Sequence, residues 1–299
     1  MPRFVDGPVV VSVPATSANL GPGFDSLGLA LDLRDRLTGE VVVGPGLDVE
    51  VAGEGAGGLP LDESHLVVRA MRVAFDEMGE QPPGLRLRCH NAIPHARGLG
   101  SSSAAIVGGI ALARALVAGG TLLLDDDGAF RLAARLEGHP DNVAPAWYGG
   151  LVICGRERDW YAVPAAVDPR VDVVVFVPPD PLSTELARGL LPEAVPHAEA
   201  AANAGRTALL VAALGSAPEH LLTATRDYLH QGYRRSAMPA SLDLVEALRA
   251  DGVAAVVSGA GPTVLAFCAG CDATALARRA PVGWEARRLE VDRAGVRVE

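Results

Sequence analysis

The fold of this chain is decided by the stretch Pro94-His95-Ala96-Arg97-Gly98-Leu99-Gly100-Ser101-Ser102-Ser103-Ala104-Ala105, which joins a glycine turn and three hydroxyls to small apolar residues. Gly98 and Gly100 can adopt backbone angles closed to other residues, so that successive N–H groups converge on an anion. The serines offer an N-cap and hydroxyls that reach phosphate oxygens or a magnesium ion. The run that follows predicts a helix that packs closely on a sheet and directs its positive end at the ligand. The stretch therefore predicts a phosphate-binding loop, although serine-capped glycine turns also open helices that bind nothing.

The sequence contains no lysine: all 26 of its Lys+Arg positions are arginine. This excludes the Walker A loop and the protein-kinase pattern, because both need a lysine at the phosphates. It also excludes a pyridoxal enzyme, which needs a Schiff-base lysine. The spacing Gly98-Leu99-Gly100 lacks the third glycine of the dinucleotide-binding fingerprint, and no suitable acidic residue follows it to hold a ribose.

The length and net charge of the chain limit the number of domains and the kinds of partner. A chain of 299 residues exceeds the size at which one core usually keeps growing, which favours two domains. We place the boundary near residue 165, giving domains 1–165 and 166–299. A formal net charge of −10 without an arginine-rich block argues against nucleic-acid binding. Because neither a signal-peptide pattern nor an apolar run of about 18 residues is present, we expect a cytoplasmic enzyme with no membrane contact.

Four cysteines are scattered along the chain, and only Cys268 and Cys271 are closely spaced. Such a pair occurs in thioredoxin-type redox motifs and in half zinc sites. Because no second pair and no adjacent histidine accompany it, a metal or redox function is the minor alternative.

Hydrophobic periodicity predicts mixed strands and helices in two blocks. In the first block we expect strands at 9–14, 37–43, 47–51, 85–89 and 149–154, and helices at 66–78, 102–118 and 129–137. In the second block we expect a strand at 171–177, helices at 185–190, 199–214, 218–228 and 241–250, and a hairpin of strands 253–258 and 264–267. The intermixed strands and helices favour an α+β fold over a doubly wound sheet.

Three segments together resemble the GHMP superfamily of small-molecule kinases, which includes galactokinase, homoserine kinase and mevalonate kinase. These are Pro14–Asp25, Gly98–Ser103 and Ser258–Pro262, similar in that order to the family's three motifs. Two further segments, Glu137–Ala146 and Ser183–Pro192, look like those of the homoserine kinase family. The resemblance implies an α+β, two-domain GHMP-kinase fold, with an N-terminal ribosomal-protein-S5-like α/β domain and a C-terminal ferredoxin-like α+β domain.

The resemblance implies phosphoryl transfer from ATP to the side-chain hydroxyl of L-homoserine, the step before threonine synthase in threonine biosynthesis. Homoserine carries a carboxylate, an ammonium and a neutral hydroxyl, so its site needs a cation, an anion and a polar orienting group. Similar positions in the family assign Arg188 and Arg234 to the carboxylate, where a guanidinium can form two charge-assisted bonds. In this assignment Arg235 competes with Arg234. The resemblance further implies Asp25 for the ammonium, and Asn19 and Asn142 for the amino-acid end or the hydroxyl.

For ATP, the resemblance implies a backbone cradle of Pro94, His95, Ala96, Arg97, Gly98, Leu99, Gly100, Ser101, Ser102, Ser103 and Ala104. We expect Mg²⁺ on hard oxygen ligands, with Ser102, Ser103 and Glu137 as the candidates. The expected catalytic residues are Asn142, Asp141, Thr184 and Arg188.

The role of each catalytic residue stays open at this point. Asp141 accepts the hydroxyl proton, orients Asn142 or caps a turn, and a dedicated base is dispensable where the transition state is loose. Thr184 bonds the phosphate or the acceptor. His95 and His139 each lie beside a proline in a loop, which favours turn or packing roles.

Three alternatives accompany this hypothesis. A sibling kinase for another alcohol would share the ATP loop and differ at Arg188 and Arg234. A catalytically silent member would bind a ligand with the same fold. An RNA- or protein-binding module is disfavoured by the acidic charge, and salt-dependent RNA retention would revive it. A homodimer is expected from the family resemblance alone.

Overall fold

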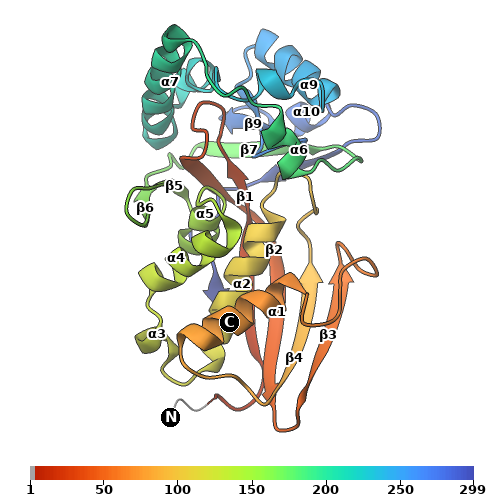
Figure 1. The fold of residues 1–299 in the computed structure, drawn as a ribbon. Coiled ribbons are helices and arrows are strands. Elements are labelled where there is room, and N and C mark those ends of the chain that lie inside the picture. The colour runs from red at the N-terminus through yellow and green to blue at the C-terminus, as the bar shows by residue number, and fades with distance from the viewer. Residues whose placement is uncertain (1–3) are drawn as a thin grey trace.

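The computed structural model describes residues 4–299 as two antiparallel-rich sheets with helices packed on them (Figure 1). The first sheet has the order β11-β1-β2-β4-β3, and β5 pairs with both β2 and β6. Its strands are β1 (Val9–Ala18), β2 (Leu27–Val42), β3 (Gly46–Gly53), β4 (Gly84–Asn91), β5 (Leu151–Arg156), β6 (Trp160–Ala165) and β11 (Arg297–Val298). Only the β3–β4 pair among them is parallel.

Five helices accompany the first sheet and cover one of its faces in Figure 1. They are α1 (Leu66–Glu77), α2 (Ser101–Leu116), α3 (Gly120–Leu123), α4 (Asp126–Glu137) and α5 (Val143–Tyr148). The central helix α2 begins at the predicted phosphate loop. Its small residues let it pack closely: a Cβ at Gly109 would lie 2.6 Å from the carbonyl oxygen of Val67 in α1.

The second sheet has the order β10-β7-β9-β8 and is antiparallel throughout. Its strands are β7 (Val171–Val177), β8 (Ala255–Val257), β9 (Val264–Ala269) and β10 (Glu285–Leu289). The helical segments of this part are α6 (Thr184–Gly189), α7 (His197–Gly215), η1 (Pro218–His220), α8 (Leu221–Ala224), η2 (Gly232–Arg234), α9 (Pro239–Ala250) and α10 (Ala273–Ala277). The arrangement confirms the predicted α+β class.

Strand β7 joins the two hydrophobic cores of the molecule. Val173 and Val175 on one face belong to the large core that also contains β1, β2 and α2. Val174 and Phe176 on the other face belong to a smaller core beneath α9 and α10. Because both faces of β7 are buried, its sequence is continuously apolar rather than alternating.

Several predicted boundaries were wrong. Strand β1 continues past Pro14 to Ala18, and β2 begins at Leu27 instead of residue 37, because the ladder between them resumes after a register shift at Pro14/Ala15. The helix predicted at 218–228 ends at Ala224. Beyond it, the Asp227 carboxylate accepts hydrogen bonds from three backbone N–H groups and so replaces the helical pattern. The short strands β6, β10 and β11 were not predicted.

The chain passes from the first sheet to the second between Ala165 and Val171. We therefore propose a division near residue 165, with the qualification that the final strand β11 crosses back and pairs with β1. Cys268 and Cys271 form a disulfide, and residues 4–299 contain no group of three or more His, Cys, Asp or Glu side chains suited to a metal ion. In the same range no helix is both long and apolar enough to cross a membrane.

Candidate active site

A cavity of about 260 Å³ opens where the three glycine-containing loops meet. It is lined by residues from both sheets' loops, namely Asn19, Ala96, Gly98, Gly100, Ser101, Ser102, Glu137, His139, Asp141, Asn142, Leu182, Ser183, Thr184, Arg188, Arg234, Gly259 and Ala260. The cavity thus brings together every predicted catalytic residue, with Asn19 and Arg234.

The phosphate loop and the loop after β8 hold each other directly. The hydroxyl of Ser258 donates to the carbonyl oxygen of Gly98 at 2.6 Å, and its oxygen is left to accept from the hydroxyl of Ser17 at 2.8 Å. A Cβ at Gly98 would overlap the carbonyl oxygen of Ser258, so only glycine permits this approach. The contact closes one wall of the cavity.

Strained backbone gathers in two of the loops. Asn19, Leu20, Asp25 and Ala96 are the non-glycine residues with positive φ between residues 4 and 299. Three of them belong to the loop between β1 and β2, and Ala96 belongs to the phosphate loop. Such angles cost free energy and persist where surrounding contacts fix the backbone, which is typical of binding sites.

The first loop is fixed by the carboxamide of Asn19. Its Oδ1 accepts from the backbone N–H of Asp25, and its Nδ2 donates to the carbonyl oxygen of Gly259, both at 2.9 Å. A carboxamide has two acceptor sites and two donors, so Asn19 retains one of each for a ligand in the cavity. It therefore joins the first and third motifs while lining the site.

Opposite charges lie side by side at the cavity. The guanidinium of Arg188, from α6, donates to both carboxylate oxygens of Asp25 at 2.6 and 3.1 Å. The Asp25 carboxylate raises the pKa of Arg188, against the opposing effect of burial. Asp25 does not itself line the cavity and is reached through this pair.

Arg234 is the second cation and is only 1% exposed. No carboxylate lies within ion-pair distance of it in the part of the chain that the structure describes. Burial and the neighbouring charge of Arg188 lower the pKa of Arg234 to about 10. Both guanidinium groups lie over the Phe24 ring, at 5.5 and 5.6 Å from its centroid. Arg235 instead pairs with Asp243 at the surface, so Arg234 is the arginine at the cavity.

The start of α2 holds an oxygen-rich cluster. The hydroxyls of Ser102 and Ser103 donate to the two carboxylate oxygens of Glu137 at 2.9 and 2.8 Å. Glu137 is the last residue of α4. The cluster lies at the positive end of α2, where a phosphate is favoured as well.

The turn between α4 and α5 supplies the remaining polar groups. Nδ1 of His139 lies 2.8 Å from Oδ1 of the buried Asp141. Although burial opposes the charged form, this contact raises the pKa of His139 above its ordinary value. Asn142 follows, and its Oδ1 accepts the Thr16 hydroxyl at 2.9 Å, which turns the amide N–H groups of Asn142 away from Thr16.

The residues of the predicted ATP cradle differ in their positions: some line a cavity, and others support the loop. Ala96, Gly98, Gly100, Ser101 and Ser102 line this cavity, His95 and Ala104 line a second cavity beside it, and Pro94, Arg97, Leu99 and Ser103 line neither. Arg97 donates to the carbonyl oxygens of His95 and Pro178, which ties the loop to the end of β7.

Sequence reasoning gave no role to Thr16 or Phe24, although both lie within the first motif. A hydroxyl in a strand and an aromatic residue in a loop carry no signal of function by themselves. Their partners, Asn142 and the two arginines, are distant in sequence.

A second, more apolar cavity of about 390 Å³ adjoins the first and shares Ser101 and Ser102 with it. Leu59, Pro60, Leu66 and Ala105 supply apolar walls. His65 also lines it and is 4% exposed, and neither ring nitrogen has a hydrogen-bond partner within residues 4–299.

Comparisons with known proteins identify the family of this chain. The family model for the GHMP kinases N terminal domain matches residues 65–150, and that for the GHMP kinases C terminal matches residues 206–280. The homoserine kinase of Streptomyces avermitilis is 54% identical, over 99% of this chain and 97% of its own. That of Streptomyces coelicolor is 53% identical, over 99% of this chain and 96% of its own.

Solved structures show the same fold. The homoserine kinase of Cytophaga hutchinsonii matches with a TM-score of 0.87 at 24% identity, over 99% of both chains. A putative homoserine kinase of Listeria monocytogenes matches with a TM-score of 0.76 at 31% identity, over 97% of this chain and 99% of its own.

The fold and the glycine-loop site define a small-molecule kinase of the GHMP superfamily, and the expected two-domain GHMP-kinase fold is confirmed. The sequence matches are more specific than the fold. On them, the chain belongs to the homoserine kinase family.

Gly100→Ala tests the junction of the first two motifs. The new Cβ would overlap the Thr16 hydroxyl and lie 3.1 Å from Oδ1 of Asn142, so we expect kcat to fall by about tenfold or more as Asn142 shifts. The matched control is Gly119→Ala, which also has a positive φ at a helix N-cap but has no atom within 4 Å of its Cβ. On denaturant unfolding the control should lose about 1 kcal/mol of stability from its left-handed backbone, and Gly100→Ala should lose more because of the overlap with Thr16. Equal kcat values for the two would contradict this role of Gly100.

Proposed function

We propose that this protein transfers the γ-phosphoryl group of ATP to the side-chain hydroxyl of L-homoserine, giving O-phospho-L-homoserine and ADP in threonine biosynthesis. The observation that carries the proposal is the buried guanidinium of Arg234 at the cavity, without a carboxylate partner among residues 4–299. A buried cation requires an anionic partner. The α-carboxylate of an amino-acid substrate supplies one.

The neighbouring ion pair fits the rest of a zwitterion. Arg188 joins Arg234 as a second donor to the carboxylate, and Asp25 accepts from the ammonium. The free donor and acceptor of Asn19 serve the same end of the substrate. With the charged end held there, the hydroxyl extends toward Asn142 and Thr184, which line the cavity beside the phosphate loop.

ATP is proposed to occupy both cavities. Its phosphates lie along the backbone of Ala96 to Ser102 at the N-terminus of α2, where N–H groups and the helix dipole favour anions. Its base lies in the adjoining apolar cavity, whose walls suit a flat aromatic ring. The shared Ser101 and Ser102 mark the passage between the two.

The oxygen cluster at α2 fits Mg²⁺. One carboxylate, from Glu137, and the hydroxyls of Ser102 and Ser103 are hard oxygen donors that already converge, and Mg²⁺ typically takes one or two carboxylates together with substrate phosphates. Bound there, the ion would neutralise charge on the phosphates during transfer. We propose these three residues as its protein ligands or as partners of its bound waters.

In the reaction the acceptor hydroxyl attacks the γ-phosphorus, the bond to the β,γ-bridging oxygen breaks, and ADP leaves. A loose transition state asks mainly for alignment and charge stabilisation. Asn142, oriented by Thr16, aligns the hydroxyl, and Thr184 donates to the transferring phosphoryl group. Asp141 is the carboxylate nearest to Asn142 in the chain, and it receives the hydroxyl proton directly or through water.

The cytoplasm, where ATP and free amino acids are abundant, is the proposed location, and a homodimer is proposed from the family resemblance alone.

The first experiment measures ADP release by the purified protein with ATP and Mg²⁺ against L-homoserine, L-serine, mevalonate and galactose, with mass detection of the product. We expect phosphorylation of homoserine alone. Turnover of another alcohol would show a sibling kinase and overturn the acceptor assignments. No turnover with retained ATP binding would favour a silent ligand-binding member.

Arg188→Ala removes two charge-assisted bonds from the acceptor site. We expect KM for homoserine to rise about 10- to 100-fold and KM for ATP to change by less than about threefold. Arg235→Ala is the control, because Arg235 pairs with Asp243 at the surface. Equal losses for both substrates would remove Arg188 from the acceptor site.

Asp141→Asn measures how much proton transfer contributes. General-base catalysis typically supplies about 10²–10⁴-fold, whereas we expect kcat to fall by less than about 10²-fold because positioning dominates. The measurement is kcat at saturating homoserine and ATP. A larger fall, with loss of the pH dependence of kcat, would make Asp141 an essential base.

Glu137→Gln weakens the proposed metal site without changing its size. We expect the free Mg²⁺ concentration for half-maximal activity to rise roughly tenfold, while KM for homoserine stays unchanged. Glu77→Gln, at the exposed end of α1, is the control. An unchanged Mg²⁺ requirement would place the ion elsewhere.

His65→Phe tests the proposed base cavity, because it keeps a similar ring and removes both unpartnered nitrogens. We expect KM for ATP to rise about three- to tenfold, the effect of one lost hydrogen bond, with KM for homoserine unchanged. The exposed His220→Phe is the control. No change in KM for ATP would exclude hydrogen bonding between His65 and the nucleotide.

A further inference from the structure

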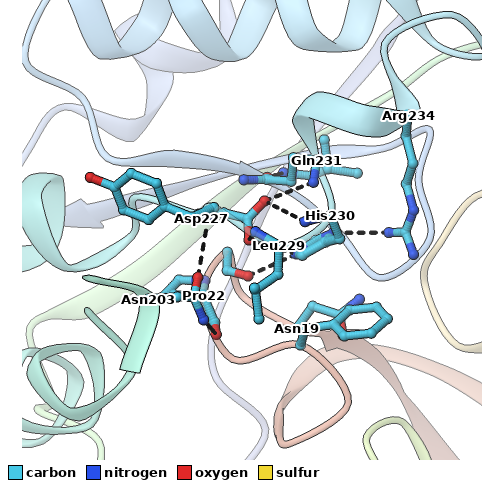
Figure 2. A network of polar contacts seen from close by, with 12 residues as sticks. Asn19, Pro22, Asn203, Asp227, Leu229, His230, Gln231 and Arg234 are labelled. Atoms are coloured by element: carbon cyan, nitrogen blue, oxygen red, sulfur yellow. Dashed lines mark hydrogen bonds and ion pairs between the residues drawn. The ribbon is translucent and has the colours of Figure 1, made fainter. Parts of the chain in front are cut away.

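The buried side chain of His230 forms a hydrogen bond with the guanidinium of Arg234. Nη1 of Arg234 lies 2.9 Å from Nδ1 of His230, and its Nε donates to the carbonyl oxygen of Ala187 at 3.2 Å. Figure 2 shows the arginine and the imidazole joined in this way. Because a guanidinium has donors only, Nδ1 must be the acceptor and therefore carries no proton.

The other ring nitrogen fixes the tautomer. Nε2 of His230 lies 2.7 Å from the carbonyl oxygen of Gly21, which can only accept, so Nε2 carries the proton. The side chain is completely buried, and this burial lowers the pKa of His230 below its ordinary value. The imidazole is therefore neutral, with an N–H directed at the first loop and a lone pair directed at Arg234.

The backbone that carries His230 is held as well. The Asp227 carboxylate accepts from the N–H groups of His230 at 3.1 Å and Gln231 at 2.7 Å (Figure 2). The imidazole stacks on Phe24, with ring centroids 5.2 Å apart. His230 thus has little freedom to rotate, and its ring contacts the loop that also carries Asp25.

We propose that His230 is a positioning residue that aims the Arg234 guanidinium at the substrate carboxylate and links it to the loop bearing Asp25. The inference rests on the proposed function, in which Arg234 binds the carboxylate. Without the acceptor at Nδ1, Arg234 loses one of the contacts that set its direction. Substrate binding then weakens, whereas the ATP site and the chemical step are untouched.

Two substitutions test the roles of the two ring nitrogens of His230 separately. The side-chain oxygen of His230→Asn falls near the Nδ1 position, so it keeps an acceptor for Arg234 and loses the bond to Gly21. The amide nitrogen of His230→Gln falls near the Nε2 position, so it keeps the bond to Gly21 and loses the acceptor. We expect KM for homoserine to rise about tenfold in His230→Gln and less than threefold in His230→Asn, with kcat and KM for ATP unchanged in both.

A substrate that lacks the carboxylate distinguishes a loss of Arg234 positioning from a general loosening of the fold. 3-Amino-1-propanol keeps the amine and the hydroxyl of homoserine and lacks its carboxylate. We expect His230→Gln to lower kcat/KM for homoserine about tenfold and to leave kcat/KM for 3-amino-1-propanol unchanged. In an Arg234→Met background, His230→Gln should cause no further loss, because its target is already gone.

Several results would overturn the inference. His230 would be a packing residue only if His230→Gln lowered kcat/KM equally for homoserine and 3-amino-1-propanol. The same conclusion would follow from equal KM values for homoserine in His230→Asn and His230→Gln, or from an additive loss in the Arg234→Met background. If His230→Gln does not fold, the ¹⁵N shifts of His230 in the unaltered protein decide: an Nε2–H tautomer supports the inference, and an Nδ1–H or doubly protonated ring overturns it. A failure of the proposed function can be told apart from a failure of this inference, because the unaltered protein would then not phosphorylate homoserine.

Discussion

The site depends on one close approach between backbones, in which the phosphate loop meets the loop after β8. Ser258 donates to the carbonyl oxygen of Gly98, and the N–H of Gly259 donates to Ala18 at the end of β1. These contacts bring three segments together that are separated by up to 241 residues in sequence. A Cβ at Gly98 would overlap the carbonyl oxygen of Ser258, so the spacing of these two loops requires glycine at this position.

The positive groups at the cavity contrast with the negative net charge of the chain. The protein carries a net charge of −10, which repels anionic substrates at long range. The cavity compensates locally with α2, whose N-terminus faces it, and with two arginines stacked on Phe24. Because the guanidinium of Arg234 is buried, its interaction with a carboxylate is screened less than at a surface, whereas Arg188 is partly exposed.

The support for these charges comes from the second sheet and its helices. Arg188 lies on α6 and Arg234 on η2, and the strand β7 that precedes them has both faces buried in hydrophobic cores. Asp25 and Asn19 come from the loop between β1 and β2 of the first sheet. The proposed acceptor site is therefore completed only when the two parts of the chain pack together, and β7, which contributes to both cores, supports that packing.

The sequence by itself determined the element types wherever one periodicity prevailed, as in α2, in β7 and in the hairpin after residue 253. It also predicted a phosphate-binding loop, because its glycines and serines suit an anion, and the structure places part of this loop at the cavity. The tertiary structure alone decided the extension of β1 and β2, the end of the helix at Ala224, and the choice of Arg234 over Arg235 at the cavity. It alone revealed Thr16, Phe24 and His230 as partners of the site. Local patterns record burial and backbone conformation, whereas the direction of a side chain depends on contacts with segments that the sequence places far away.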